Sequence, residues 1–283
     1  MRNILRVDVE DYFHPSEVQI GAQRSVDLSS WDNLPSRVEY STSIVLDLLA
    51  AHDTQATFFV LGWVAQRFPY LVRRIAAAGH EVACHSYAHR LVYQLSPAEF
   101  REDTMSAVAA IQDACGITPT AYRAPSYSIV QSSLWALDIL AECGFTADSS
   151  IYPIRHDRYG IPGHPRGPHH IQTPSGSILE VPPATVRLSS SRTVPVGGGG
   201  YLRLLPYRFS AAGIRTINRE DSFPACIYFH PWELDPAQPR IASSPISRLR
   251  TYLGLTSMHS KLNRLLTDFQ FSTLSAALAG FPE

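Results

Sequence analysis

The chain has 283 residues, which at about 150 residues per domain predicts one or two domains. Hydrophobic residues make up 45% of the chain, enough for a sizeable core and too many for a mainly disordered protein. Its 24 Lys and Arg residues nearly balance 25 Asp and Glu residues. This balance argues against a nucleic-acid partner that binds a basic surface.

Three further features concern membranes and compartment. No run of residues approaches the ~18 consecutive apolar positions that a membrane span needs. Residues 1–8 lack the apolar core of a secretory signal. The cysteines are scattered without a close pair, which favours reduced thiols over disulfides or a zinc-thiolate site; they are Cys84, Cys115, Cys143 and Cys226. We therefore expect a cytoplasmic protein without a membrane span.

The first half of the chain alternates between short apolar runs and longer amphipathic segments. Strands are expected at 4–9, 56–61, 81–84, 121–123 and 146–148. Helices are expected over 36–52, 63–78, 96–115 and 132–143. This alternation is typical of an α/β fold with parallel strands.

The alternation stops after residue 152. Residues 153–200 are rich in Pro, Gly, His and Arg and are interpreted as an insertion beside the site, with short strands at 178–181 and 185–188. A helix over 206–218 and a strand over 225–230 follow. Residues 234–283 are expected to form a helical extension, with helices near 246–253 and 257–269.

The chemistry-bearing residues follow the expected strands, where parallel α/β folds collect reactive groups. The first strand ends in Asp8, Glu10 and Asp11, and three neighbouring carboxylates repel one another unless a cation compensates. Asp8 and Glu10 share one strand face. A solvated acidic turn is the plain alternative.

Two histidines follow the third strand. His85 and His89 are four residues apart, a spacing that lets two imidazoles on one side of a helical turn bind one metal ion. Taken alone, the pair is more simply explained as two ordinary histidines, one of them structural.

Two later strands end in further candidates. Arg123 is followed by Pro125, and an arginine buried at this place would need an anionic partner. His230 directly follows an apolar strand and precedes Pro231, which suits an acid or base. Taken alone, Arg123 is more simply explained as a surface arginine and His230 as a core histidine.

Together, these four strand ends resemble the polysaccharide deacetylase family, the NodB-type carbohydrate esterases, over roughly residues 4–152 and 225–233. The His-Ser-Tyr-Ala-His motif of residues 85–89 is the most specific part. The runs at 8–14, 198–207 and 230–233 resemble the subgroup encoded with bacterial exopolysaccharide and exosortase systems. That subgroup carries a C-terminal extension.

The resemblance implies a distorted (β/α) barrel of about seven strands, with the active-site groove at the carboxyl ends of the strands. Residues 1–233 would form the catalytic domain, with the insertion at 153–200. Residues 234–283 would pack against the same domain. The implied substrate is an N-acetylated polysaccharide or oligosaccharide.

The resemblance also implies a divalent metal, most typically zinc, bound by two histidines and one acidic residue. His85 and His89 match the two histidines. Either Glu10 or Asp11 matches the acidic ligand, and the sequence leaves that choice open.

The remaining catalytic roles are implied in the same way. Asp8 matches the base that activates water, and Arg123 matches the arginine that orients it. His230 matches the acid that protonates the leaving amine, and Asp148 matches the residue that orients His230.

Substrate contacts are assigned to three residues. The backbone N–H of Ser126 falls where the family places an oxyanion donor, and Tyr127 is the adjacent aromatic residue. Trp232 is a candidate surface for stacking a sugar. Other hypotheses are hydrolysis of another linear amide or an O-acetyl ester, and an inactive carbohydrate-binding scaffold.

Overall fold

A single curved sheet organises the molecule. The computed structural model describes the chain except for residues 16–27, 190–191, 242–244, 280 and 282–283. Over the described residues the sheet has nine strands, in the order β10-β1-β2-β3-β4-β5-β7-β6, with β11 pairing β1. From β10 to β7, neighbouring strands are parallel. The bounds of these seven strands are β1 (Asn3–Val9), β2 (Thr57–Val60), β3 (Glu81–Cys84), β4 (Ala121–Tyr122), β5 (Ala147–Asp148), β7 (Gly176–Glu180) and β10 (Cys226–Phe229).

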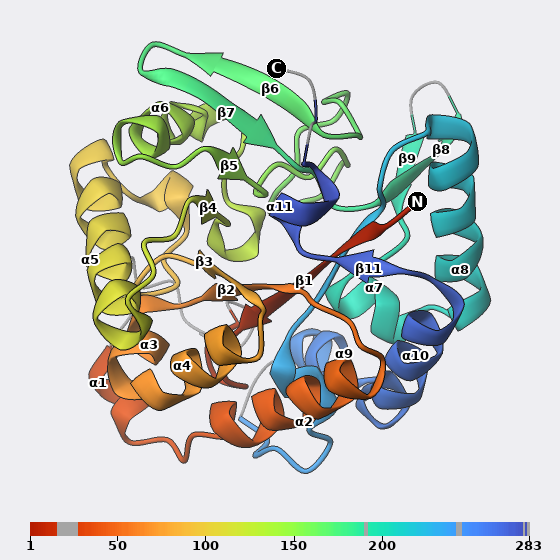
Figure 1. The fold of residues 1–283 in the computed structure, drawn as a ribbon, viewed down its shortest axis with the longest axis horizontal. Helices are drawn as coiled ribbons and strands as arrows, with labels where there is room; N and C mark the ends of the chain where they lie inside the picture. Colours follow the sequence, from red (N-terminus) through yellow and green to blue (C-terminus); the bar gives the residue numbers. More distant parts are fainter. Residues whose placement is uncertain (16–27, 190–191, 242–244, 280, 282–283) are drawn as a thin grey trace.

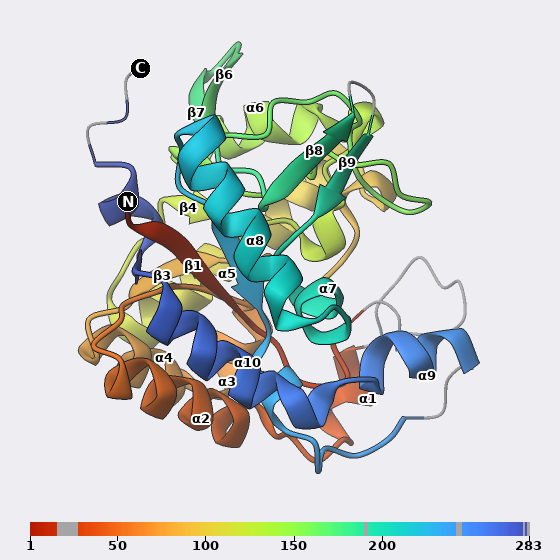
Figure 2. The same ribbon diagram turned by 90° about the vertical axis from the view of Figure 1, so that its right-hand side faces the viewer.

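Helices surround this sheet (Figure 1). Their bounds are α1 (Leu28–Asp32), α2 (Val38–Ala51), α3 (Gly62–Arg67), α4 (Pro69–Ala77), α5 (Pro97–Cys115), α6 (Trp135–Glu142), α7 (Gly199–Leu204), α8 (Tyr207–Thr216), α9 (Pro245–Tyr252), α10 (Leu255–Asp268) and α11 (Leu274–Ala277). Two further strands, β8 (Thr185–Ser189) and β9 (Arg192–Pro195), form a separate antiparallel pair. Figure 2 shows α8 and α10 on the side turned toward the viewer.

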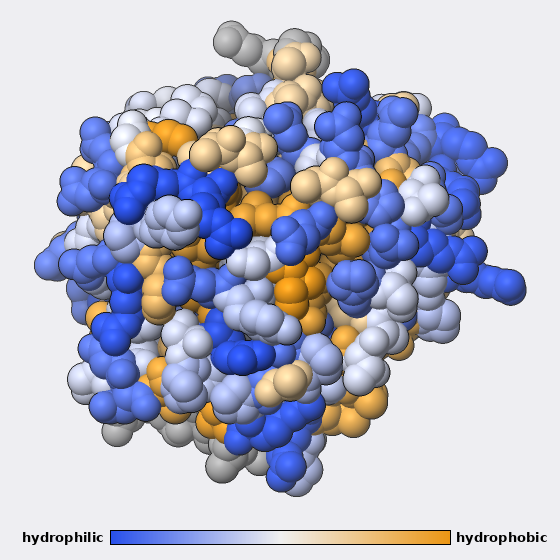
Figure 3. Space-filling model, turned by 60° about the horizontal axis from the view of Figure 1, so that its bottom comes forward, coloured by the Kyte–Doolittle hydropathy of each residue, from blue (hydrophilic) through white to orange (hydrophobic). Residues whose placement is uncertain are grey.

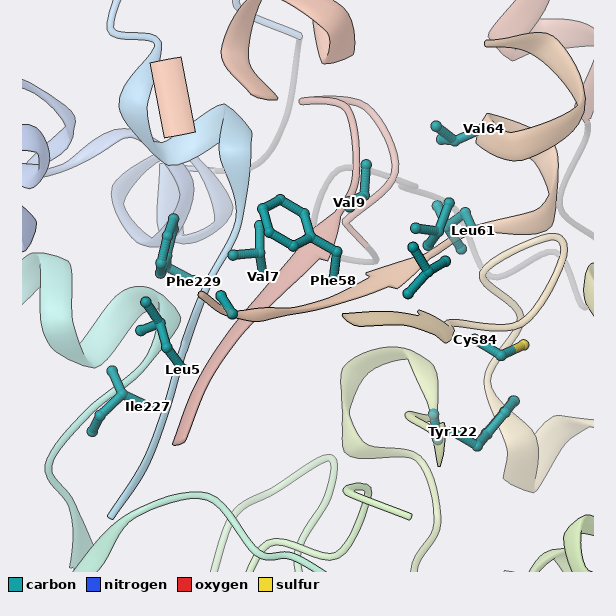
Figure 4. Close-up of a cluster of buried hydrophobic side chains, with 14 of the residues drawn as sticks. Leu5, Val7, Val9, Phe58, Leu61, Val64, Cys84, Tyr122, Ile227 and Phe229 are labelled. Atoms are coloured by element: carbon teal, nitrogen blue, oxygen red, sulfur yellow. The ribbon is translucent and has the colours of Figure 1, made fainter. Parts of the chain in front are cut away.

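The strands are buried on both faces, as expected for parallel strands covered by helices. All seven residues of β1 are buried. Its odd-numbered positions Leu5, Val7 and Val9 belong to the large core between the sheet and the helices (Figure 4). Arg6 and Asp8 alternate with them and therefore face the other side of the sheet.

A second apolar cluster shows how the sheet closes. It takes one residue from each parallel strand or its end, together with two residues from the α11 region: Ile4, Phe59, Ala83, Ala121, Ala147, Val181, Cys226, Leu274 and Leu278. Beyond β7, the amide of Ala184 donates to the carbonyl of Cys226 on β10 at 2.9 Å. The sheet therefore curls into a distorted barrel, which confirms the expected α/β fold of about seven strands.

In two of the expected helices, individual residues determine where the helix begins and ends. The helix expected over 63–78 is two helices, α3 and α4, because Pro69 lacks an N–H and begins a new helix. The helix expected over 96–115 is observed as α5. Ser96 and Glu99 form a capping box at its start, and Gly116, with φ of 77°, ends it.

The segment 153–200 does more than line the site. Its hairpin of β6 (His169–Thr173) and β7 supplies a barrel strand, since β7 pairs in parallel with β5. Its glycine run leads into α7, which the sequence analysis did not anticipate. A Cβ at Gly198 would lie only 2.0 Å from the Tyr228 ring, so glycine permits this close approach.

The C-terminal segment packs onto the barrel through α10 and returns a short strand to it. Met258, Leu262 and Leu265 of α10 are buried. The strand β11 (Phe271–Ser272) pairs with the start of β1, although only helices were expected here.

The surface is largely polar, and the thiols are unpaired. The face in Figure 3 carries mainly hydrophilic side chains, with apolar ones gathered near its middle. The described helices include none with the length and apolarity to cross a membrane. All four cysteines are free thiols.

Candidate active site

The carboxyl ends of four strands on one side of the barrel bring the candidate residues together. Asp8 lies near the end of β1, His85 directly follows β3, Arg123 follows β4 and His230 follows β10. A cavity of about 270 Å³ lies beside them. Glu10, His89, Arg123 and His230 are among the residues that line it.

Three buried donor groups face one another at this cavity. Oε1 of Glu10 lies 3.0 Å from Nε2 of His85 and 3.1 Å from Nε2 of His89. The ligand atoms of these three residues all lie within 4.8 Å of one another. Nδ1 of His85 donates to the carbonyl of Arg123 at 2.7 Å, which leaves the lone pair of Nε2 directed at the cluster.

This donor set fits a divalent transition metal. Two imidazole nitrogens and one carboxylate are ligands that zinc and related ions accept. Burial lowers the pKa of His85, which favours the neutral, metal-binding form. Burial alone would raise the pKa of Glu10, but the charges of His89 and His230 lower it well below its ordinary value.

The carboxylate of Asp11, the other acidic ligand considered from the sequence, makes its hydrogen bonds outside this cluster. Oδ2 of Asp11 accepts from the hydroxyl of Ser36 at 2.6 Å and from the amides of Arg37 and Val38 at 2.8 and 3.1 Å. Oδ1 accepts from the amide of Tyr12 at 2.9 Å. Oδ2 is therefore used at the start of α2 and Oδ1 in the turn after β1, and the three-residue cluster contains Glu10 but not Asp11.

Asp8 and Arg123 form a buried ion pair beside the cluster. Nη2 of Arg123 lies 2.9 Å from Oδ2 of Asp8, with both side chains at most 2% exposed. The guanidinium also lies over the rings of Tyr127 and Tyr228, at 4.1 and 4.7 Å from their centroids. These contacts hold Arg123 and thereby orient Asp8.

His230 is held by Glu233, which the sequence analysis did not assign. Oε2 of Glu233 accepts from both the backbone amide and Nδ1 of His230, each at 3.0 Å. This leaves Nε2 toward Asp8, 3.6 Å from its Oδ2. Burial opposes the imidazolium charge, but Glu10 and Glu233 raise the pKa of His230 to about 9.

Asp148 serves a different part of the site from the one expected. Its carboxylate accepts from the hydroxyl of Ser150 at 2.6 Å, and that hydroxyl accepts from the amide of Ala124 at 2.8 Å. Asp148 also pairs with Glu180, and burial raises the pKa of both groups. Asp148 therefore supports the turn after β4 through Ser150, whereas Nδ1 of His230, for which Asp148 was the expected partner, contacts Glu233.

The three expected substrate contacts all line the cavity. Ser126 and Tyr127 have φ of 50° and 55°, a strained backbone that often occurs at functional sites. Tyr127 packs against the ring of Tyr152 at 4.7 Å. Trp232 stacks on His230, with ring centroids 5.2 Å apart and an interplanar angle of 22°.

His156 and Tyr201 also line the cavity, as do Tyr159 and Arg203, to which the sequence analysis gave no role. Glu233 also lines the cavity, three residues after His230. That spacing is typical of a capping box, and it is the signal that could have identified Glu233. Arg203 has no comparable local signal because its partners are distant in sequence.

Two family models match the chain. Residues 22–147 match the model described as polysaccharide deacetylase. Residues 149–279 match a domain of unknown function, DUF3473. The first match includes His85, His89 and Arg123, and the second includes His230 and Glu233.

Similar proteins agree with the first match. The chain is 39% identical over 123 residues to a chitooligosaccharide deacetylase of Bradyrhizobium sp., covering 43% of this chain and 52% of that protein. It is 30% identical over 120 residues to a peptidoglycan-N-acetylglucosamine deacetylase of Bacillus cereus, covering 38% and 44%. The chain thus spans about half the length of these curated relatives.

A solved structure extends the likeness in fold to nearly the whole chain. The crystal structure of an allantoinase matches with a TM-score of 0.65 and 15% identity, over 99% of this chain and 91% of that one. At this identity the likeness concerns the fold alone.

Proposed function

We propose, because residues 22–147 match the polysaccharide deacetylase model, that the chain is a metal-dependent hydrolase of carbohydrate N-acetyl groups. Its substrate would be the N-acetylhexosamine units of a bacterial exopolysaccharide or of its precursor. The observation that carries this proposal is the convergence of Glu10, His85 and His89 beside Asp8 and His230 at one cavity.

The metal site would be formed by Glu10, His85 and His89. A divalent ion such as zinc, bound there, would supply Lewis-acid polarisation of the acetyl carbonyl. The side chains around the site would bind the sugar, orient it and move protons.

Asp8 would act as the base. Its carboxylate is buried and lies 2.9 Å from Arg123, so its position is restrained. It would take a proton from the water that attacks the acetyl carbon, and a new C–O bond would form. The backbone N–H of Ser126 would stabilise the negative charge that develops on the acetyl oxygen.

His230 would act as the acid. Nδ1 is hydrogen-bonded to the carboxylate of Glu233, which favours the protonated imidazole, and Nε2 faces Asp8. As the C–N bond breaks, Nε2 would give its proton to the leaving amine. The products are then acetate and a free amino sugar, and the water supplies the oxygen of the acetate.

The names of similar proteins and the aromatic residues of the cavity support this substrate class. Curated relatives are named as deacetylases of chitooligosaccharides and of peptidoglycan N-acetylglucosamine. The DUF3473 match over residues 149–279 supports the exopolysaccharide-associated subgroup. Tyr127 and Trp232 line the cavity and would contact the sugar ring.

The test is acetate release from N-acetylglucosamine oligomers and from N-acetylated exopolysaccharide fragments. The protein is assayed as purified, after treatment with a chelator, and after addition of zinc or cobalt. Release should require the metal and should be lost in His85→Ala. His170→Ala removes a histidine outside the site and serves as the control.

Other outcomes point to the alternatives. Stoichiometric metal without acetate release from these amides would contradict the proposed substrate, and O-acetyl esters and other linear amides would then be assayed. Wild-type protein with neither bound metal nor release would contradict the enzyme proposal and favour a carbohydrate-binding scaffold.

A further inference from the structure

Arg203 on α7 is buried, and its guanidinium makes four hydrogen bonds. Nε donates to Oε1 of Glu233 at 2.8 Å. Nη1 donates to the carbonyls of Thr251 and Leu253, each at 2.8 Å, and Nη2 donates to the carbonyl of Arg250 at 2.7 Å. A planar guanidinium with these partners has a single orientation available to it.

Glu233 connects this guanidinium to the imidazole of His230. One oxygen of Glu233 accepts from Arg203, and the other accepts from Nδ1 of His230. The carboxylate is fully buried, so without a cation it would be an unpaired charge in the protein interior. Arg203 is therefore the group that allows Glu233 to stay ionised and in place beside His230.

Trp232 adds a second connection between the same residues. Its ring stacks on His230, and the guanidinium of Arg203 lies 5.5 Å from the ring centroid. Arg203 thus restrains both the hydrogen-bonded edge and the stacked face of the imidazole.

From these contacts we propose that Arg203 is a positioning residue for His230, and that α9 and the turn after it serve the reaction by holding Arg203. This inference rests on the proposed function. It gives a role to part of residues 149–279, which match a domain of unknown function. The carbonyls that hold Arg203 come from α9 and the turn after it, whereas the metal-binding cluster lies on the loops after β1 and β3.

The variants Arg203→Met and Arg203→Lys test this inference in the metal-loaded enzyme. Arg203→Met should lower kcat for acetate release by about 10- to 100-fold, a loss of the size found when a hydrogen-bond partner of a metal ligand is removed. KM and bound metal should stay close to the wild-type values. Arg203→Lys should retain more activity than Arg203→Met, because an ammonium still neutralises Glu233.

Lys261→Met is the matched control. Nζ of Lys261 donates to the carbonyls of Leu202, Arg203 and Leu205, so it ties α10 to the end of α7 without contacting Glu233 or His230. This variant should lower the melting temperature and leave kcat unchanged. An equal loss of kcat in Lys261→Met and Arg203→Met would overturn the proposal, because general loosening of α7 would then explain both.

A measurement without substrate separates this inference from the proposed function. In the wild-type proton NMR spectrum, the Nδ1–H of His230 should give a downfield, slowly exchanging signal, assigned by its loss in His230→Gln. That signal should weaken or disappear in Arg203→Met. If Arg203→Met does not fold, the same change is expected in Arg203→Lys. A signal unchanged in a folded Arg203 variant would refute the positioning role, even if the wild-type protein released no acetate.

Discussion

Nε2 of His230 lies 3.6 Å from Oδ2 of Asp8. The proposed acid and the proposed base therefore face each other directly, on the ends of the neighbouring strands β10 and β1. Each is oriented from behind by a residue of opposite charge, Glu233 for His230 and Arg123 for Asp8. This arrangement holds both groups in place beside the cavity, which His230 lines.

The first prediction separates Glu10 from Asp11. Glu10→Ala should abolish stoichiometric metal binding, since it removes a ligand from a three-residue site. Asp11→Ala should keep the metal but lower the free energy of unfolding by about 2 kcal/mol, because buried amides at the start of α2 lose their acceptor. Metal analysis and urea denaturation measure the two effects. If Asp11→Ala lost the metal and Glu10→Ala kept it, the metal ligand would be Asp11 and not Glu10.

The second prediction concerns the charge of His230 in the metal-free protein. Its pKa should be near 9, because Glu10, Glu233 and Asp8 favour the imidazolium. Glu233→Gln should lower that pKa, since it removes a carboxylate that accepts from Nδ1. Nitrogen-15 NMR titration of histidine-labelled protein measures both values, with His230→Gln as the assignment control. A wild-type pKa at or below the ordinary value of about 6.5 would contradict the prediction.

The third prediction is a loss of stability in mild acid caused by His80. Burial lowers its pKa to about 4, and Nδ1 accepts from the amide of Ala56 at 3.3 Å. Between pH 6.5 and 4 the unfolded chain binds a proton at this residue that the folded chain does not. The free energy of unfolding should therefore decrease as the pH is lowered across that window, by up to about 3 kcal/mol.

Urea denaturation between pH 7 and 4 measures this slope. His80→Phe should be less stable at pH 7, because the amide of Ala56 loses its acceptor, but its stability should depend less on pH. Equal slopes for the wild type and His80→Phe would show that other groups cause the acid sensitivity.

The fourth prediction uses two neighbouring glycines. Gly198 has φ of 137° and a Cβ there would meet the Tyr228 ring, whereas at Gly200 the closest atom would be 3.7 Å away. Gly198→Ala should destabilise the protein by more than about 2 kcal/mol. Gly200→Ala, inside α7, should be neutral or stabilise it by up to about 1 kcal/mol. Thermal unfolding compares the pair, and similar losses in both variants would contradict this view of the turn.

Local sequence patterns determined much of the fold. Alternation along residues 4–9 predicted that Leu5, Val7 and Val9 share one face of the first strand, and the structure places these three side chains together in the large core. The capping residues Ser96 and Glu99 and the terminal Gly116 predicted the limits of α5. These features depend on contacts between residues a few positions apart, which a sequence displays directly.

The tertiary structure decided which of several similar groups belongs to the site. Asp11 lies next to Glu10 in sequence, but it caps α2 through residues 25 to 27 positions away. Glu233 rather than Asp148 contacts His230, because the turn after β10 brings Glu233 back onto the imidazole while Asp148 holds Ser150.

The sequence by itself therefore determined the residue types, their spacing and their placement at strand ends. Only the folded chain decided that β7 joins the barrel and that Arg203 reaches both Glu233 and the carbonyls near residue 251. The physical reason is that a buried charge needs partners from several segments at once. Those partners are brought together by packing, and no local pattern records them.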